Sequence, residues 1–206
     1  MWYAKTKIQI YNSEEWYNKI ADSYSKYHDE LNRDKNFLVR RFPRDIDGAV
    51  IADLWSWDSR HSKLFDRKKI KKYIWLDIAD KLLKKSPSWV DKRVANLEEK
   101  RPLENESVDL CLAYFILIHL NNLEHFFAEA NRVLKLGWRL ILLHNIQKRA
   151  FSFHVWKETF KIEFQHHSLE DIETIWVNAG FKVKSQEFIE DTVLIAKWYC
   201  FEKDRK

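Results

Sequence analysis

A short apolar run that turns abruptly polar constrains the fold of this chain more than any other stretch. Val50, Ile51 and Ala52 suit a buried strand, and the chain becomes polar after Asp53 and Leu54. In an open α/β sheet, a ligand binds just beyond the carboxyl ends of the strands. Residues 49–62 therefore predict a buried strand followed by a loop that faces a ligand.

Further apolar runs alternate with helical patterns along the rest of the chain, which is typical of a mostly parallel sheet. Residues 110–117 are nearly all apolar, as expected for a central strand that is buried on both faces. Ser13 and Ser168 suit helix N-caps, and Gly180 suits a helix end. Strands are expected at 50–52, 71–76, 93–95, 110–117, 139–143 and 193–201, with a hairpin strand from 181, and helices at 13–31, 61–69, 79–85, 123–136 and 171–180.

Length and composition limit the class of protein. A chain of 206 residues is expected to form one domain with a substantial core. The net charge of +5 permits contact with nucleic acid without pointing to it. No apolar run approaches the roughly 20 residues of a membrane span, and residues 1–12 are too polar for a signal peptide, so a cytoplasmic protein is expected. Cys111 and Cys200 suggest neither a disulfide framework nor a thiolate metal site.

Residues 49–59 resemble the first motif of the class I S-adenosylmethionine (SAM)-dependent methyltransferases, an apolar run followed by Asp-Leu-Gly-x-Gly-x-Gly. Asp53 matches the motif, whereas Trp55, Trp57 and Ser59 stand where that family has glycine. A loop that turns sharply and lets its backbone approach a ligand favours residues without a Cβ atom. An indole at position 55 or 57 is therefore expected to fill the cofactor's space or to block the turn.

The ends of the next two expected strands extend the resemblance. Asp77 lies 24 residues beyond Asp53 and matches the acidic residue with which the family holds the ribose hydroxyls of SAM. Ile78 follows it directly. Asn96 and Leu97 resemble the turn that holds the adenine. The resemblance therefore implies a SAM site that includes these four residues together with Asp53 and the loop from 55 to 59.

Two tyrosines complete the expected pocket. The segment around Tyr24 is similar to the N-terminal helix that caps the SAM pocket in small-molecule methyltransferases, and Tyr114 follows the core of the expected fourth strand. Residues 102–109 are similar to the family's link into that strand. Residues 132–138 resemble the family text Arg-Val-Leu-Lys-Pro-Gly-Gly, with Trp138 in place of the second glycine.

The resemblance spans residues 14–201 and implies a Rossmann-like, seven-stranded class I methyltransferase fold with helices on both faces of a mostly parallel sheet. Residues 1–47 are expected to form a helical cap, 48–144 the cofactor-binding half, and 145–206 a variable region and a C-terminal hairpin. The expected activity is methyl transfer from SAM to an acceptor of unidentified class: a small molecule, an RNA or a protein. The alternative is a catalytically inactive methyltransferase-like binding protein, because tryptophan replaces motif glycines. Neither the acceptor nor the oligomeric state follows from the sequence.

No catalytic base is evident from the sequence. His119, His144, His166 and His167 are candidates by residue type, although a histidine in or after a strand is more often structural. No metal-ligand spacing occurs among the histidines and acidic residues. A basic cluster at Arg40, Arg41 and Arg44 suits a phosphate or acidic ligand, and equally a solvated surface.

The tryptophans at family glycine positions suggest a hypothesis about the genetic code. The chain has 3 glycines and 10 tryptophans, whereas about 7% glycine, or about 14 residues, is average. Trp55, Trp57, Trp75 and Trp138 all stand where the family has glycine. The codon UGA is read as tryptophan under one variant code and as glycine under another. These four residues are therefore hypothesised to be glycine in the natural protein.

Overall fold

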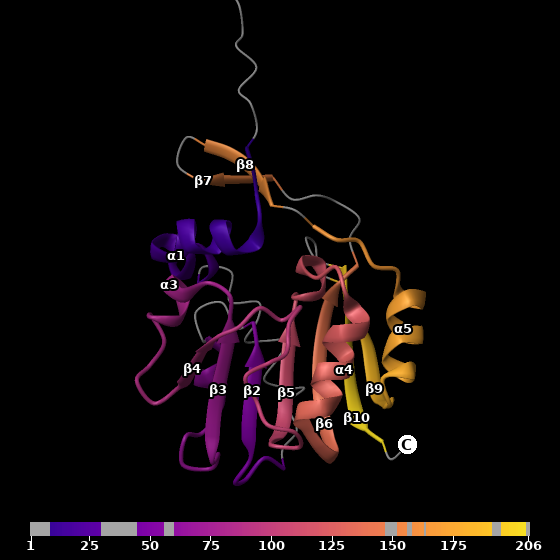
Figure 1. The fold of residues 1–206 in the computed structure, drawn as a ribbon. Helices are drawn as coiled ribbons and strands as arrows, with labels where there is room; N and C mark the ends of the chain where they lie inside the picture. The colour runs from indigo at the N-terminus through magenta and orange to yellow at the C-terminus, as the bar shows by residue number, and fades with distance from the viewer. Residues whose placement is uncertain are drawn as a thin grey trace, which may run out of the picture.

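A seven-stranded sheet forms the centre of the molecule (Figure 1). The computed structural model describes residues 9–29, 45–55, 60–146, 152–155, 158–162, 164–190 and 195–204. The strand order is β4-β3-β2-β5-β6-β10-β9. The strands are β2 (Val50–Leu54), β3 (Lys72–Asp77), β4 (Asp91–Val94), β5 (Val108–Tyr114), β6 (Leu134–Asn145), β9 (Phe181–Glu190) and β10 (Ile195–Lys203).

The pairing of these strands places the ends of β2, β3 and β5 side by side. The five strands from β4 to β6 run parallel, and β10 pairs antiparallel with both β6 and β9. Asp53 is in register with Trp75 of β3 and with Leu112 of β5. This arrangement confirms the predicted Rossmann-like, mostly parallel seven-stranded sheet, and it brings the loops after the parallel strands to one edge.

Burial follows the predicted pattern. Every residue of β5 is buried, and Ile51 to Leu54 of β2 are buried as well. Strand β5 ends at Tyr114, three residues before the predicted end, because Phe115 adopts a positive φ of 56° and turns the chain into the short 3-10 helix η2 (Leu117–His119). Within the described residues, no helix is long and apolar enough to cross a membrane.

The two helices beside the second half of the sheet form near the expected positions. Helix α4 (Leu123–Val133) begins at the N-cap Asn122, whose side chain accepts a hydrogen bond from the His125 amide. It ends three residues before the predicted end because β6 begins at Leu134. Helix α5 (Leu169–Asn178) has its N-cap at Ser168, as predicted, with the Ser168 hydroxyl accepting from the Asp171 amide at 3.0 Å, but the helix begins and ends two residues earlier than predicted. Gly180 follows α5 with a φ of 85°, a conformation that favours glycine.

Helix α1 (Ser13–Asp29) differs from the prediction at its first turn. Asn12, not Ser13, takes the N-cap role: its side-chain oxygen accepts from the Glu15 amide at 2.9 Å, and Glu15 accepts from the Asn12 amide. This capping box leaves the Ser13 hydroxyl available for another contact. The helix is fixed to the short helix α3 (Asp80–Leu83) by a hydrogen bond from the Lys81 amide to Asn18.

The crossover between β2 and β3 contains less helix than predicted. A helix was expected over 61–69, whereas the chain forms only a 3-10 turn, η1 (Arg60–Leu64), followed by turns. The polar pattern of this segment leaves few apolar side chains to pack, and Asp66 accepts backbone hydrogen bonds that close a turn instead. The described part of the crossover therefore contributes only a 3-10 turn beside the carboxyl edge of the sheet.

A second, three-stranded sheet lies above the carboxyl ends of the main sheet, close to α1 (Figure 1). Its strands are β1 (Gln9–Tyr11), β8 (Glu158–Ile162) and β7 (Ser152–Val155), in the order β1-β8-β7. The sequence pattern did not predict it, because β1 pairs with a strand about 150 residues away. This small sheet covers the side on which the candidate site lies.

Candidate functional site

A pocket of about 290 Å³ opens at the carboxyl edge of the sheet. Ligand pockets for small molecules usually start at about 300 Å³, so this pocket is at the small end of that range. It combines side chains that follow β2, β3, β4 and β5 with the start of α1. Its lining includes Trp55, Ile78, Asn96, Leu97, Ile116 and His119.

The turn after β3 has the features expected of a ribose site. Asp77 is fully buried at the strand tip, and its Oδ1 accepts a hydrogen bond from the Ala79 amide at 2.8 Å. Its Oδ2 is buried without a hydrogen-bond partner among the described residues. Burial raises the pKa of Asp77 to about 8, and the nearby Asp53 carboxylate adds to the rise. An unused buried acceptor of this kind fits a ligand that brings hydroxyl donors.

The turn after β4 forms the opposite wall of the pocket. Leu97 is buried, and Asn96 folds back on its own turn, donating to Glu99 and accepting from the Glu98 amide. The Glu98 carboxylate in turn accepts from the backbone and side chain of Asn121, at 2.5 and 3.2 Å. The apolar Leu97 and Ile78 side chains thus line a slot that is held in place by polar turns on its rim.

The turn after β2 is different, because one oxygen of its acidic residue is bonded to side chains from other elements, while the other oxygen is buried without a partner among the described residues. Asp53 is fully buried, and its Oδ2 accepts a hydrogen bond from the Tyr73 hydroxyl. The same oxygen lies 3.2 Å from Nδ1 of the buried His61. Neither partner was anticipated from the sequence, since they come from β3 and from η1. These contacts indicate that Asp53 organises the turn from within.

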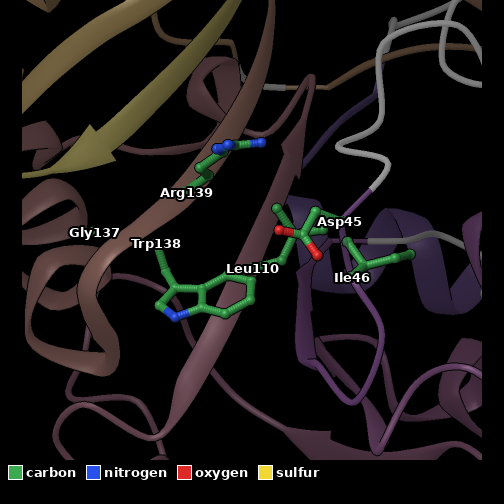
Figure 2. Close-up of a pocket in the computed structure, with 6 residues that line it drawn as sticks. All are labelled: Asp45, Ile46, Leu110, Gly137, Trp138 and Arg139. Atoms are coloured by element: carbon green, nitrogen blue, oxygen red, sulfur yellow. The ribbon is translucent and has the colours of Figure 1, made fainter.

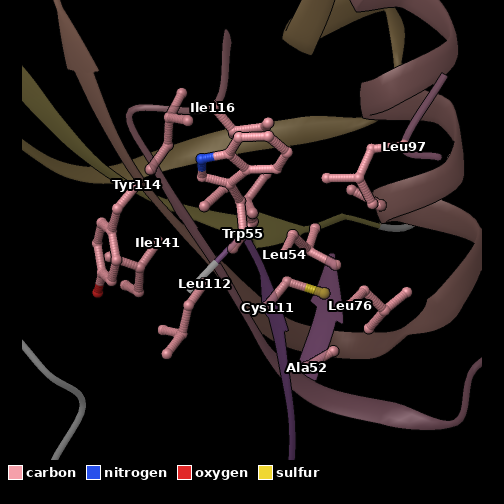
Figure 3. Packing of buried hydrophobic residues seen from close by; sticks show 14 of the residues in the cluster. Ala52, Leu54, Trp55, Leu76, Leu97, Cys111, Leu112, Tyr114, Ile116 and Ile141 are labelled. Atoms are coloured by element: carbon pink, nitrogen blue, oxygen red, sulfur yellow. The ribbon is translucent and has the colours of Figure 1, made fainter. Parts of the chain in front are cut away.

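Trp55 lines the pocket with a buried indole. Its φ is 96°, its side chain is only 3% exposed, and its amide donates to the Leu76 carbonyl at 3.1 Å. The indole meets the Tyr17 ring edge-on at 4.9 Å between centroids and lies 5.1 Å from the His119 ring. Figure 3 shows the indole among Leu54, Leu97 and Ile116. The Trp55 side chain therefore fills space between the turns after the strands and the start of α1.

The remaining predicted residues lie outside this pocket or outside the described residues. Tyr114 is buried and packs edge-on against His61 at 4.6 Å, and Tyr24 is buried 6.0 Å from Tyr17. Neither tyrosine lines the pocket, and the fully buried Asp53 and Asp77 lie behind its lining residues. Trp57, Ser59 and the basic cluster Arg40, Arg41 and Arg44 lie outside the described residues.

His119 joins the pocket to the N-terminal helix. Its Nδ1 lies 2.9 Å from the Ser13 hydroxyl and its Nε2 lies 3.2 Å from the Tyr17 hydroxyl. Burial lowers the pKa of His119 to about 3, so the ring is neutral near pH 7. Sequence reasoning missed Ser13 and Tyr17; their spacing of one helical turn places both hydroxyls on one face of α1, which is the only signal that the sequence offers.

The other candidate histidines lie farther along the sheet edge. Burial lowers the pKa of His144, at the end of β6, to about 4, and His167 lies with Nε2 2.8 Å from the Leu120 carbonyl. His166 lies next to this residue in the segment before α5. The described residues contain no group of three or more His, Cys, Asp and Glu side chains that would hold a metal ion.

A second, smaller pocket lies near the start of β6 (Figure 2). It has a volume of about 120 Å³ and is lined by Asp45, Ile46, Leu110, Gly137, Trp138 and Arg139. Gly137 has a φ of 77°, whereas Trp138 has no positive φ. Trp138 therefore lies away from the cofactor pocket, in a backbone conformation that any residue adopts.

Residues 58–142 match the family model described as a methyltransferase domain. A search of curated proteins finds no match. Among solved structures, the methyltransferase partner of the Trm112 activator in Haloferax volcanii is 17% identical, with a TM-score of 0.75 over 92% of this chain and 98% of that chain.

Two further structures show how widely the fold is used. A SAM-dependent methyltransferase from Mesorhizobium loti is 13% identical, with a TM-score of 0.64 over 80% of this chain and 95% of that chain. A [4+2]-cyclase, SpnF, is 10% identical, with a TM-score of 0.72 over 97% of this chain and 100% of that chain. At these identities the structures show a shared fold. Residues 58–142 thus resemble a methyltransferase domain, and the chain has the Rossmann-like fold of the class I SAM-dependent methyltransferases.

Proposed function

We propose that this protein transfers a methyl group from SAM to an acceptor that is a small molecule, an RNA or a protein. The observation that carries the proposal is the turn after β3, where Asp77 keeps one buried carboxylate oxygen without a partner among the described residues. Ile78, the next residue, lines the pocket together with Asn96 and Leu97. The ribose would bind to Asp77, and the adenine would lie between Ile78 and Leu97.

The cofactor fits only part of the site as the structure stands. The turns after β3 and β4 offer an acceptor and apolar walls, but the Trp55 indole fills the space between them. Glycine at position 55 would remove this obstacle without altering the backbone, because φ at this residue is already positive. We propose that the binding-competent form of the protein carries glycine there.

When bound, SAM supplies a methyl group on a positively charged sulfur, which is activated toward nucleophiles. The protein's own contribution is to position the two reactants and to exclude water. Helix α1 and the small β1-β8-β7 sheet lie over the carboxyl edge and would enclose them (Figure 1). His119 has the Ser13 and Tyr17 hydroxyl groups beside its two ring nitrogens, so it holds α1 in place at the pocket.

The division of the chain follows from this proposal. Residues 1–47 would cap the site, residues 48–144 would bind the cofactor, and residues 145–206 would complete the sheet and shape the acceptor site. The acceptor is selected by the cap and by the region 145–167.

Label transfer tests the function directly. The Trp55→Gly variant would be incubated with methyl-labelled SAM and separate small-molecule, RNA and protein fractions of the host. The expected result is label in one fraction, and the matched control is Trp55→Gly combined with Asp77→Asn, which should lose that label. Equal labelling by both variants, or no labelling of any fraction by a variant that binds SAM, would contradict methyl transfer at this site.

A further inference from the structure

The structure separates the tryptophans that stand at family glycine positions. Among the described residues other than glycine, a positive φ occurs at Trp55, Glu106 and Phe115. Trp75 lies inside β3, paired on both sides, and Trp138 follows Gly137 in β6. The backbone at positions 75 and 138 accepts any residue, so among the three described positions only position 55 has a conformation that itself favours glycine.

The φ of Trp55 is outside the region that side chains tolerate. The left-handed region open to residues with a Cβ atom spans a φ of about +50 to +70°. Phe115 at 56° and Glu106 at 48° lie in or beside this region, whereas Trp55 is at 96°. A residue held in such a conformation costs about 1–3 kcal/mol, and glycine does not incur this cost.

The polar group of the Trp55 side chain makes no hydrogen bond to the described residues around it. Its indole N–H is buried without a hydrogen-bond partner among the described residues, although buried tryptophans usually have one. Its ring lies against Tyr17 and His119 in the slot beside Ile78 and Leu97. The strain and the obstruction therefore arise from the same residue.

Trp16 provides the contrast within the same molecule. It lies in α1 without a positive φ, is 1% exposed, and its ring is 6.4 Å from that of Tyr11. Glycine at this helical position would lower the stability of the helix by about 1 kcal/mol. The backbone conformation thus favours a side chain at position 16 and glycine at position 55.

We infer that residue 55 of the native protein is glycine, encoded by a UGA codon that the source organism reads as glycine and that the printed sequence gives as tryptophan. This inference deepens the proposed function, on which it rests, because the glycine opens the nucleoside pocket. The low glycine count, 3 in 206 residues beside 10 tryptophans, agrees with such a substitution throughout the chain.

Mass spectrometry of the protein purified from its source organism tests the inference. Trypsin releases residues 45–60 as one peptide, because it cleaves after Arg44 and Arg60. The expected result is a fragment series with glycine at position 55, and the same peptide also reports position 57. The peptide of residues 8–19, which contains Trp16, is the internal control and should show tryptophan.

The outcomes separate the inference from the function. Tryptophan at position 55 in the native peptide would overturn the inference, whatever the protein binds. Glycine at position 55, with no SAM binding by the Trp55→Gly variant, would uphold the inference and contradict the proposed function.

Discussion

The turns after β2 and β3 lie side by side at one sheet edge, yet only one of them is prepared for a ligand. Asp53, in the first turn, is buried and bonded to Tyr73 and His61. Asp77, in the second, is equally buried, accepts from the Ala79 amide of its own turn, and is followed by Ile78, which lines the pocket. Each of the two carboxylates keeps one buried oxygen without a partner among the described residues, so the two aspartates differ in the neighbours of the other oxygen. A buried carboxylate oxygen without a partner therefore points to a ligand only where its own turn lines a pocket and leaves space there.

The obstruction in the first turn gives the largest expected effect. Trp55→Gly should raise the affinity for SAM by at least about 100-fold, or about 2.7 kcal/mol, because it clears the slot beside Ile78 and Leu97. Calorimetric titration of both chains with SAM measures the change. Tight binding by the unaltered chain would contradict the steric argument.

The second turn should supply the next largest effect. In the Trp55→Gly background, and above pH 8 where Asp77 is ionised, Asp77→Asn should weaken SAM binding by about 10–100-fold, because hydrogen bonds to a charged group contribute about 1.5–3 kcal/mol. The same titration measures it. An unchanged dissociation constant would show that the ribose does not bind at Asp77.

Asp77 also predicts a pH dependence of stability. Its pKa is raised to about 8 from the ordinary 3.8, so between these values the folded state binds a proton that the unfolded state releases. Its contribution to the free energy of unfolding therefore falls as pH rises from about 4 to 8, and SAM affinity of the Trp55→Gly variant rises over the upper part of that range. The free energy of unfolding, measured with urea across this pH range, should decline more steeply for the unaltered chain than for Asp77→Asn. Parallel curves would contradict the raised pKa.

A smaller effect should follow from the internal bonding of Asp53. Tyr73→Phe removes one donor from the buried carboxylate and should lower the free energy of unfolding by about 1–3 kcal/mol. In the Trp55→Gly background it should change SAM affinity by less than about threefold, because the Tyr73 hydroxyl is bonded to Asp53 inside the protein. A large loss of affinity with unchanged stability would place Asp53 at the ligand.

Trp138→Gly should have the smallest effect and serves as the matched control for Trp55→Gly. Trp138 lines the separate pocket near the start of β6, so SAM affinity should change by less than about twofold. Titration of this variant checks it. A gain in affinity comparable to that of Trp55→Gly would mean that glycine acts through general loosening of the fold.

The sequence was sufficient for the sheet and for the caps that depend on local chemistry. The apolar run of β5 and the Ser168 and Gly180 ends of α5 were predictable, because periodicity and capping are local properties. The β1-β8 pairing joins residues far apart in the chain, so no local pattern predicts it. No α-helix forms over 61–69, and the polar pattern of this segment does not predict the turn that forms in its place.

The candidate site was predictable in composition but not in contacts. Trp55, Ile78, Asn96 and Leu97 line the pocket, whereas Tyr24 and Tyr114 are buried beside it. A side chain that follows a strand core points to either face, and the sequence does not say which. The pairing of His119 with Ser13 and Tyr17 depends on how α1 docks on the sheet edge, which is a tertiary property.

The most direct test of the account is a crystal structure of the Trp55→Gly variant with S-adenosylhomocysteine. The account predicts the ribose hydroxyls on the free oxygen of Asp77 and the adenine between Ile78 and Leu97, in the space that the Trp55 indole now fills. A nucleoside bound elsewhere, with Asp77 still unpartnered and the slot closed, would contradict it.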